Sequence, residues 1–261
     1  MSFRGAIFDV DGVLVDSPHE QAWREALRQL MDNEWSDTRP RTSYAPEKFT
    51  PEVYQRVMSG KPRYAGAQGA LQHFNVPDTK RRAREYGDRK QVMIVELIEA
   101  SQFHAYPDAL RFVLAVKEAG ILIAAASSSK NANAFLERIR LDEFVEEEGR
   151  SYGFVRPGYT LLDILDANVS GRDFKQGKPH PEIFLTAAEE LEVPPAESFV
   201  VEDAANGVQA AKAGNMAALG LARADDEELL AGAGADLVVI SLDDVFLDAL
   251  AEGRLERGSL R

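Results

Sequence analysis

The chain has 261 residues, a formal net charge of −13, 45% apolar residues and no cysteine. The length allows one large domain or a core with a smaller insert, and the apolar content supports a sizeable buried core. Disulfides, thiolate metal sites and a cysteine nucleophile are excluded, and a cytoplasmic location is compatible with that. The acidic surface disfavours nucleic acid and anionic membranes as partners. No apolar run approaches the roughly 18 residues of a membrane helix.

Short apolar runs predict parallel strands that are covered on both faces. They lie at residues 5–8, 121–126, 199–201, 216–221 and 236–240. Helical stretches separate most of them, one opening at Pro107, one at Pro181 and one covering residues 204–213. This alternation predicts an α/β fold with a doubly wound parallel, Rossmann-like sheet. Ligands of such sheets bind at the carboxyl ends of the strands.

Residues 17–101 break the alternation and predict a helical domain inserted into the core, which would comprise residues 1–16 and 102–261. Within the insert, a helix is expected to start near Thr50, and residues 91–100 to form a helix with an apolar stripe of Val92, Val95 and Ile98. Residues 142–176 predict an irregular excursion with a solvated charge run and one helix near residues 161–165.

Two carboxylates, Asp9 and Asp11, follow the first strand, and Gly12 then permits a tight turn. One carboxylate can attack phosphorus while the other donates a proton to the leaving oxygen. The alternatives are a solvated acidic turn and a calcium loop. The EF-hand pattern fits poorly, because no helix precedes Asp9.

Polar residues also follow the later strands. Ser127 begins a run that continues with Ser128, Ser129, Lys130 and Asn131, and such hydroxyl and backbone N–H groups at a helix start can bind phosphate oxygens. Taken alone, the run is weak evidence for such a site, because clusters of Ser and Asn are usually caps and turns.

Two further positions carry charge at strand or helix ends. Lys178 precedes a helix and can neutralise phosphate charge, or be an ordinary surface lysine. Glu202 and Asp203 leave the third strand and suit a hard cation with oxygen ligands, or cap the next helix.

In this order, the four sites resemble the four motifs of the haloacid dehalogenase-like superfamily. The resemblance implies that Asp9 is a nucleophile, Asp11 a general acid and base, and that Ser127 and Lys178 hold the phosphoryl oxygens. It also implies Mg²⁺ bound by Asp9, the Asp11 backbone carbonyl and Asp203, with Glu202 a direct or water-mediated ligand. Gly207 fits the pattern after the fourth motif. Asp11 argues against haloacid dehalogenases and phosphonatases, which lack this aspartate.

The helical insert resembles the small helical cap of the β-phosphoglucomutase-like branch. That resemblance places Arg63, Lys90 and His19 among substrate-binding residues, together with Ser128, Lys130 and Asn131 of the core. Ordinary surface charge is the alternative for Arg63 and Lys90. His19 lies two residues closer to Asp16 than the branch leads one to expect, which argues against mutase activity.

The expected function is Mg²⁺-dependent hydrolysis of a small sugar-phosphate-like monoester through an aspartyl-phosphate. The alternatives are a β-phosphoglucomutase-type mutase and a catalytically silent binding module on the same fold. The expected partner is a small phosphorylated metabolite, and the expected state is a monomer or weak homodimer.

Overall fold

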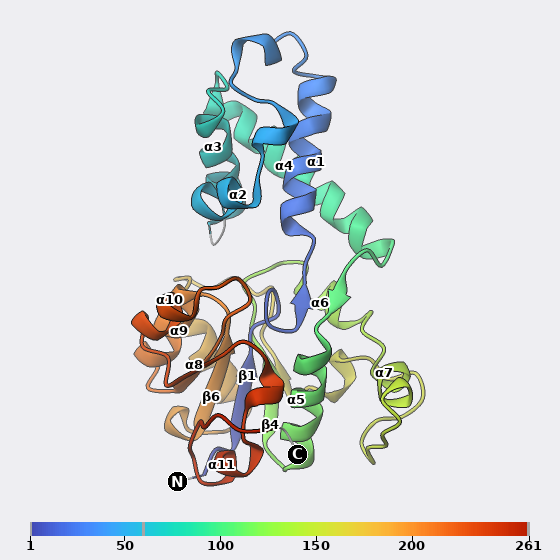
Figure 1. The fold of residues 1–261 in the computed structure, drawn as a ribbon, viewed down its shortest axis with the longest axis vertical. Coiled ribbons are helices and arrows are strands. Elements are labelled where there is room, and N and C mark those ends of the chain that lie inside the picture. The colour runs from blue at the N-terminus through green and yellow to red at the C-terminus, as the bar shows by residue number, and fades with distance from the viewer. Residues whose placement is uncertain (1, 59–60, 260–261) are drawn as a thin grey trace. The chain divides into compact units, whose positions relative to one another are not determined.

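A computed structural model describes residues 2–58 and 61–259. The chain divides into two compact units (Figure 1). The core comprises Met1–Ser17 and His104–Arg261, and the helical unit comprises Pro18–Phe103. None of the helices in the described part of the chain combines the length and apolar character required to cross a membrane.

The core contains a parallel six-stranded sheet with the order β5-β4-β1-β6-β7-β8. The expected α/β fold with a doubly wound sheet is therefore confirmed, since the chain order reverses direction at β1. The strands are β1 (Gly5–Phe8), β4 (Leu122–Ala125), β5 (Ala167–Asn168), β6 (Ser198–Glu202), β7 (Ala217–Leu221) and β8 (Leu237–Val239).

The register of the three central strands brings their carboxyl ends level. Phe8, the last residue of β1, pairs with Ala125 on one side and Val201 on the other. All four residues of β1 are buried, as expected for a strand with neighbours on both sides and helices on both faces. The residues after Phe8, Ala125 and Val201 therefore emerge at one edge of the sheet.

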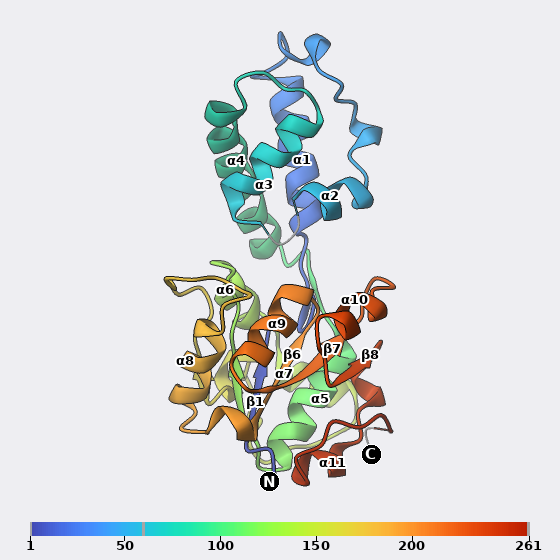
Figure 2. The ribbon, with the colours of Figure 1, turned by 90° about the vertical axis from the view of Figure 1, so that its left-hand side faces the viewer.

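Helices cover both faces of this sheet. Apolar residues of α8, α9 and α10 pack with Ile7 and Val200 on one face. On the other face, the ring of Phe112 from α5 lies 6.1 Å from that of Phe8 and 6.3 Å from that of Phe199. In Figures 1 and 2 the two groups of helices can be followed on opposite sides of β1 and β6.

The core helices are α5 (Pro107–Glu118), α6 (Ala132–Leu136), α7 (Leu141–Glu147), α8 (Glu182–Glu190), α9 (Ala205–Ala213), α10 (Glu227–Gly232) and α11 (Leu247–Ala251). Short 3₁₀ turns are η3 (Leu162–Ile164), η4 (Pro195–Glu197) and η5 (Leu242–Asp244).

The segment 142–176 differs from its sequence-based prediction. The helix expected near residues 161–165 is a single 3₁₀ turn, and the segment supplies the edge strand β5, which was not expected. A two-residue strand is too short to show an apolar pattern. Its position is fixed by pairing with Ala124 and Ala125 of β4 rather than by its own sequence.

The helical unit contains α1 (His19–Asp32), α2 (Pro51–Val57), α3 (Arg63–His73) and α4 (Thr79–Glu99), with 3₁₀ turns η1 (Arg39–Arg41) and η2 (Pro46–Lys48). Its core includes Trp23, Trp35, Phe74 and Tyr86. The helix start expected at Thr50 is present, and the Thr50 hydroxyl accepts a hydrogen bond from the Val53 N–H.

The predicted apolar stripe of α4 is wrong in part. Val92 and Val95 are exposed, while Ile94, Leu97 and Ile98 are buried. The buried face is set further upstream by Tyr86 and the residues that follow it at helical spacing. The helix predicted from the sequence covered only residues 91–100 and so did not include Tyr86.

The two chain crossings between the units run beside each other in the core. Val15–Asp16 forms β2 and His104–Ala105 forms β3, and the two pair as an antiparallel ribbon. The loop before β2, residues 10–15, folds back on itself through hydrogen bonds from the Leu14 and Val15 N–H groups to the Val10 carbonyl.

Candidate active site

The carboxyl edge of the sheet carries a buried ion cluster. The Lys178 ammonium lies 2.5 Å from Asp9 Oδ1 and also binds Glu202 Oε1. All three side chains are nearly inaccessible, with exposed fractions of 9% for Asp9, 10% for Lys178 and 2% for Glu202. Three residues that are far apart in sequence thus form one buried group at this edge of the sheet.

The electrostatics of this cluster are dominated by burial and by excess negative charge. Burial raises the pKa of Asp9 to about 7, with Glu202 and Asp11 adding to the rise and Lys178 opposing it. Burial, Glu202 and Asp9 likewise raise the pKa of Asp203. Burial acts to lower the pKa of Lys178, but Asp9 and Glu202 outweigh it and raise that pKa. Lys178 is therefore protonated, and its single positive charge does not neutralise all of the surrounding carboxylates.

Two glycines give these carboxylates their space. Gly12 has φ +82°, and a Cβ at this position would collide with the Asp203 carboxylate. A Cβ at Gly207 would collide with the Glu202 carboxylate in the same way. The positive φ accounts for the turn expected at Gly12, and Gly207, noted in the sequence only as part of a family pattern, now has a steric reason.

Ser127 links the ends of β1 and β4. Its hydroxyl donates to Asp11 Oδ2 at 3.3 Å and accepts from the Ser129 N–H at 3.0 Å. The Ser127 N–H donates to the hydroxyl of Ser170, a buried residue just after β5. Ser170 was not predicted from the sequence, because the strand before it, β5, was not predicted. The signal that could have found it is a serine directly after the short apolar segment that ends at Val169.

The rest of the Ser127 run lies differently from the buried cluster. Ser128 is exposed, and Asn131 is buried with its N–H donating to Ser129 Oγ. The Lys130 ammonium donates to the Gly171 carbonyl and to Asp173 Oδ1, both at 2.7 Å. A role for Lys130 on a substrate phosphate stays a prediction, and it would compete with these contacts.

Inside the helical unit, two of the predicted residues lie together. The Lys90 ammonium lies 3.1 Å from His19 Nδ1 and 5.4 Å from the centroid of the Trp23 ring. Lys90 is buried with only 6% of its surface exposed. A buried lysine is unusual, since burial disfavours the charged ammonium.

Arg63 belongs to a different part of the same unit. Its Nη2 donates to Gln91 Oε1 at 2.6 Å, so that the first residue of α3 contacts α4. The first two residues of the loop expected to present it, Ser59 and Gly60, lie outside the described residues.

The donors at the sheet edge suit a hard divalent cation. Asp9 and Asp203 offer carboxylate oxygens and Asp11 a backbone carbonyl, the ligands that Mg²⁺ prefers. Burial, and then neighbouring carboxylates, raise the pKa of Asp9 and Asp203, and a bound cation would favour their ionised forms. Both oxygens of Glu202 are engaged, one by Lys178 and one by the Ala204 N–H. Within residues 2–58 and 61–259, the acidic and histidine side chains form no ready-made three-ligand metal cluster.

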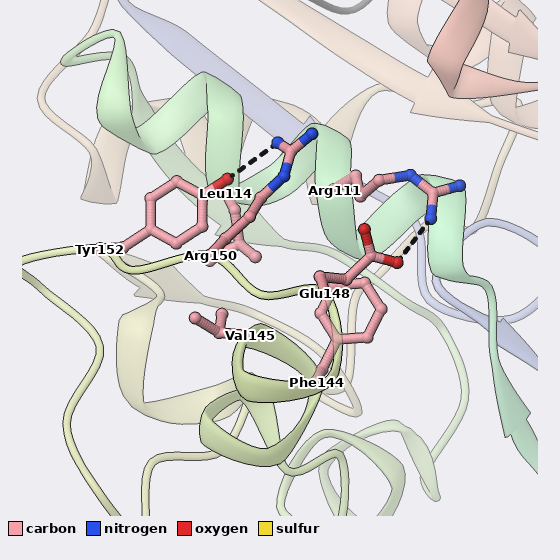
Figure 3. A pocket seen from close by; sticks show the side chains of 7 residues that line it. All are labelled: Arg111, Leu114, Phe144, Val145, Glu148, Arg150 and Tyr152. Carbon is pink, nitrogen blue, oxygen red and sulfur yellow. Dashed lines mark hydrogen bonds and ion pairs between the residues drawn. The ribbon is translucent and has the colours of Figure 1, made fainter.

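A shallow depression of about 150 Å³ lies elsewhere in the core, between α5 and the segment that begins with α7 (Figure 3). Its lining includes Arg111, which binds Glu148, and Arg150, which donates to the Tyr152 hydroxyl. None of the predicted site residues lines it.

The fold and this site define a doubly wound α/β enzyme with a buried aspartate–lysine pair at the carboxyl edge of its sheet. The family model of haloacid dehalogenase-like hydrolases matches residues 3–215. The chain belongs to this family, and within it to the β-phosphoglucomutase-like branch.

Individual relatives differ in what they are named for. The chain is 32% identical to a β-phosphoglucomutase of Mycobacterium tuberculosis, covering 93% of this chain and 91% of the relative. It is 32% identical to a phosphorylated carbohydrates phosphatase of Thermotoga maritima, covering 79% of each. The structure of an archaeal β-phosphoglucomutase from Pyrococcus superposes with a TM-score of 0.70 at 29% identity, covering 96% of this chain and 99% of that one.

Proposed function

We propose that this enzyme transfers a phosphoryl group from a small sugar phosphate to Asp9 and then to water. The observation that carries the proposal is the 2.5 Å contact between Asp9 and the Lys178 ammonium at the carboxyl edge of the sheet. A lysine so placed holds the nucleophilic carboxylate and leaves a positive charge where phosphoryl oxygens would arrive. Phosphoryl transfer depends mainly on such positioning and electrostatic stabilisation.

In the first half-reaction an oxygen of Asp9 attacks phosphorus, the bond to the leaving oxygen breaks, and Asp11 gives that oxygen its proton. The Ser127 hydroxyl, 3.3 Å from Asp11 Oδ2, orients this second carboxylate. In the second half-reaction Asp11 takes a proton from water, which attacks the aspartyl-phosphate and releases phosphate. Lys178 stays protonated throughout, since Asp9 and Glu202 raise its pKa.

Mg²⁺ would be held by Asp9, the backbone carbonyl of Asp11 and Asp203, and would neutralise charge on the phosphoryl group. Glu202 has a different task in this proposal. Because its two oxygens bind Lys178 and the Ala204 N–H, it fixes the lysine rather than the cation. The sequence had left open a direct or a water-mediated contact of Glu202 with Mg²⁺, and this proposal argues against the direct one.

One observation favours water as the final acceptor. The Lys130 ammonium is shared between Gly171 and Asp173 rather than free to hold a second phosphate. The relative from Thermotoga maritima is named as a phosphatase of phosphorylated carbohydrates, which supports the class of substrate.

A second candidate is a phosphosugar mutase, in which a sugar hydroxyl replaces water as the acceptor. The relatives named as β-phosphoglucomutases match over more than nine-tenths of this chain. Arg63 supports it too: the guanidinium donates to a neutral amide and, among the described residues, forms no ion pair. An arginine of that kind retains its charge for a distal phosphate.

One pair of assays separates these readings. Phosphate release from a panel of sugar phosphates, with Mg²⁺ and with chelator, tests phosphoryl transfer. Conversion of β-glucose 1-phosphate to glucose 6-phosphate, without phosphate release, tests the mutase. We expect Mg²⁺-dependent phosphate release. No release and no isomerisation with any sugar phosphate would contradict the proposal and favour a binding module.

A further inference from the structure

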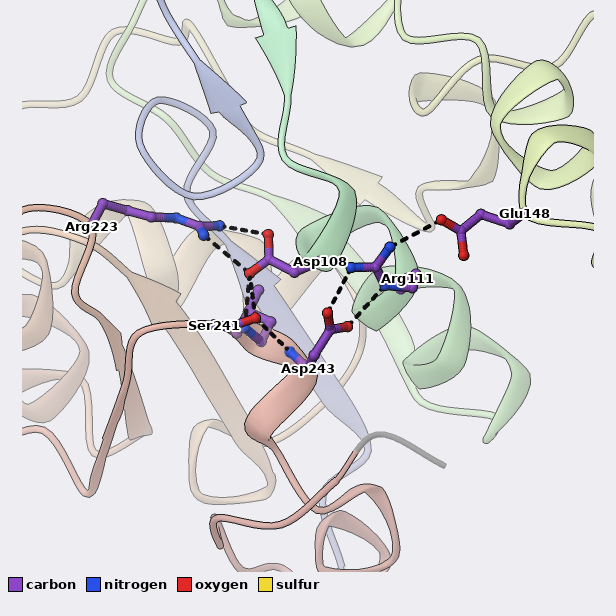
Figure 4. Close-up of polar contacts among 7 residues, drawn as sticks. Asp108, Arg111, Glu148, Arg223, Ser241 and Asp243 are labelled. Carbon is purple, nitrogen blue, oxygen red and sulfur yellow. Dashed lines mark hydrogen bonds and ion pairs between the residues drawn. The ribbon is translucent and has the colours of Figure 1, made fainter.

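A second charged network lies in the core, around the N-terminus of α5 (Figure 4). Arg223, which follows β7, forms two bonds of 3.1 Å with the two carboxylate oxygens of Asp108. Its guanidinium carbon lies 3.8 Å from the centroid of the Tyr106 ring. This arginine is thus held both by a bidentate ion pair and by stacking, a combination that lysine cannot reproduce.

The network reaches the loop that contains Asp11. Arg223 Nη2 points to the Val13 carbonyl at 3.4 Å, and the Tyr106 N–H donates to the neighbouring Leu14 carbonyl at 3.0 Å. Inside the loop, the Gly12 N–H donates to Val15. Two successive carbonyls of the loop, those of Val13 and Leu14, therefore accept hydrogen bonds from residues outside it.

Arg223 shares Asp108 with other hydrogen-bond donors. That carboxylate also accepts hydrogen bonds from the Ser241 hydroxyl and the Leu242 N–H. These contacts and Arg223 together lower the pKa of Asp108 in spite of its burial. The N-terminus of α5 is thus tied to the C-terminal segment without the arginine, and what Arg223 adds is the reach to Val13 and Tyr106.

We propose that Arg223 is a positioning residue that holds Asp11 where it can protonate the leaving oxygen, acting through the Val13 carbonyl and the Tyr106 ring. The inference rests on the proposed function, in which Asp11 is the general acid. It assigns a role in catalysis to a residue outside the four motifs that the sequence showed.

A leaving-group comparison tests this inference. An alkyl phosphate has a basic leaving oxygen that needs a proton, whereas 4-nitrophenyl phosphate has a leaving group stable without one, so a misplaced general acid slows only the former. The quantity kcat/KM reports the steps up to departure of the leaving group. In Arg223→Lys we expect kcat/KM to fall about 10- to 100-fold for the alkyl substrate, part of the 10²–10⁴ that general acids supply, and less than about threefold for the aryl one.

Two other variants calibrate the result. Arg111→Gln is the control, because Arg111 lies on α5, the helix of Asp108, and like Arg223 forms a bidentate ion pair, here with Asp243, besides a contact with Glu148, but contacts neither the Asp11 loop nor Tyr106. It should show no difference between the substrates. Asp11→Asn should show a larger difference than Arg223→Lys.

Equal losses for both substrates in Arg223→Lys, or no loss, would overturn the inference while a differential loss in Asp11→Asn left the proposed function standing. No differential loss in Asp11→Asn would mean that the acid–base assignment itself had failed, and the inference with it. If Arg223→Lys does not fold, as judged by circular dichroism, Tyr106→Leu removes the stacking partner and should show the same leaving-group signature.

Discussion

Lys178 of the core and Arg63 of the helical unit differ in the kind of partner that they bind. In the core, Lys178 pairs with Asp9 and Glu202, and all three are buried. In the helical unit, the Arg63 guanidinium donates to the neutral side-chain amide of Gln91 and forms no ion pair with the described residues. The core cluster thus contains its own counter-charges, whereas no carboxylate of the described residues neutralises the charge of Arg63. We propose that the core cluster performs the reaction and that Arg63 contributes to the choice of substrate.

Loss of the nucleophile should have the largest effect on activity. Asp9→Asn replaces the carboxylate by a nearly isosteric amide that is a poor nucleophile and a weaker metal ligand. We expect kcat to fall by about 10⁴-fold or more, since removal of a covalent nucleophile is among the largest single effects in enzymes. Initial rates with a sugar phosphate measure it, and activity within about tenfold of the wild type would contradict the role.

Removing the cation of the core cluster should cost stability as well as activity. Lys178→Met leaves Asp9 and Glu202 buried without a counter-charge, and we expect the free energy of unfolding to fall by about 3 kcal/mol. Urea unfolding measures it. Lys175→Met is the matched control, because Lys175 is exposed and lies three residues earlier. Equal, small effects in the two variants would show that the cluster does not depend on its lysine.

The pH dependence of the metal-free protein follows from the raised pKa of Asp9. Between about pH 4 and 7 the folded protein keeps a proton that the unfolded chain has released. That stabilisation is complete below the unfolded pKa and is lost as the pH rises through about 7. The raised pKa of Asp203 acts in the same direction.

In chelator, the free energy of unfolding should therefore be lower at pH 7.5 than at pH 5, by a few kcal/mol at about 1.4 kcal/mol for each unit of pKa shift. Mg²⁺ should reduce this difference in the free energy of unfolding between the two pH values, because it binds the ionised carboxylates of the folded state. Urea unfolding at the two pH values checks this, with Asp9→Asn as the reference. A metal-free protein that became more stable towards pH 7.5 would contradict the electrostatics of the core cluster.

The smallest effect concerns the helical unit. Arg63→Ala should lower kcat/KM about 10-fold for substrates with a second phosphate, because a charge-assisted contact is lost, and hardly at all for 4-nitrophenyl phosphate. Lys130→Ala should change either value less than about threefold, since Asp173 and Gly171 already hold that ammonium. Equal losses for both substrates in Arg63→Ala would make Arg63 structural, and the division of labour would then be withdrawn.

The parts of the molecule that the sequence predicted are those governed by local pattern. Five of the six strands of the sheet were expected from apolar runs, and the residues after β1, β4 and β6 were expected to converge because parallel strands end at one edge. Strand β5 was not predicted, because two residues are too few to show a periodic pattern and the position of β5 depends on its pairing with β4. Ser170, whose hydroxyl accepts a hydrogen bond from the Ser127 N–H, was not predicted for the same reason.

Side-chain partners were much less predictable than positions. The sequence placed Lys178 and Glu202 at the site, yet nothing in it showed that they bind each other, since 24 residues separate them. The same holds for Arg223, whose contact with Val13 spans 210 residues. Such pairs depend on the arrangement of loops at the sheet edge, which local propensity does not determine.

The central claim is that the phosphoryl group passes through the carboxylate of Asp9. It can be tested directly by quenching the enzyme with acid during turnover of a sugar phosphate, reducing it with borohydride and mapping it by tandem mass spectrometry. Borohydride reduces an acyl phosphate to the alcohol, so an aspartyl-phosphate is converted to homoserine. We expect homoserine at position 9, dependent on both substrate and Mg²⁺. Homoserine at another aspartate, or none in an enzyme that turns over, would contradict the claim.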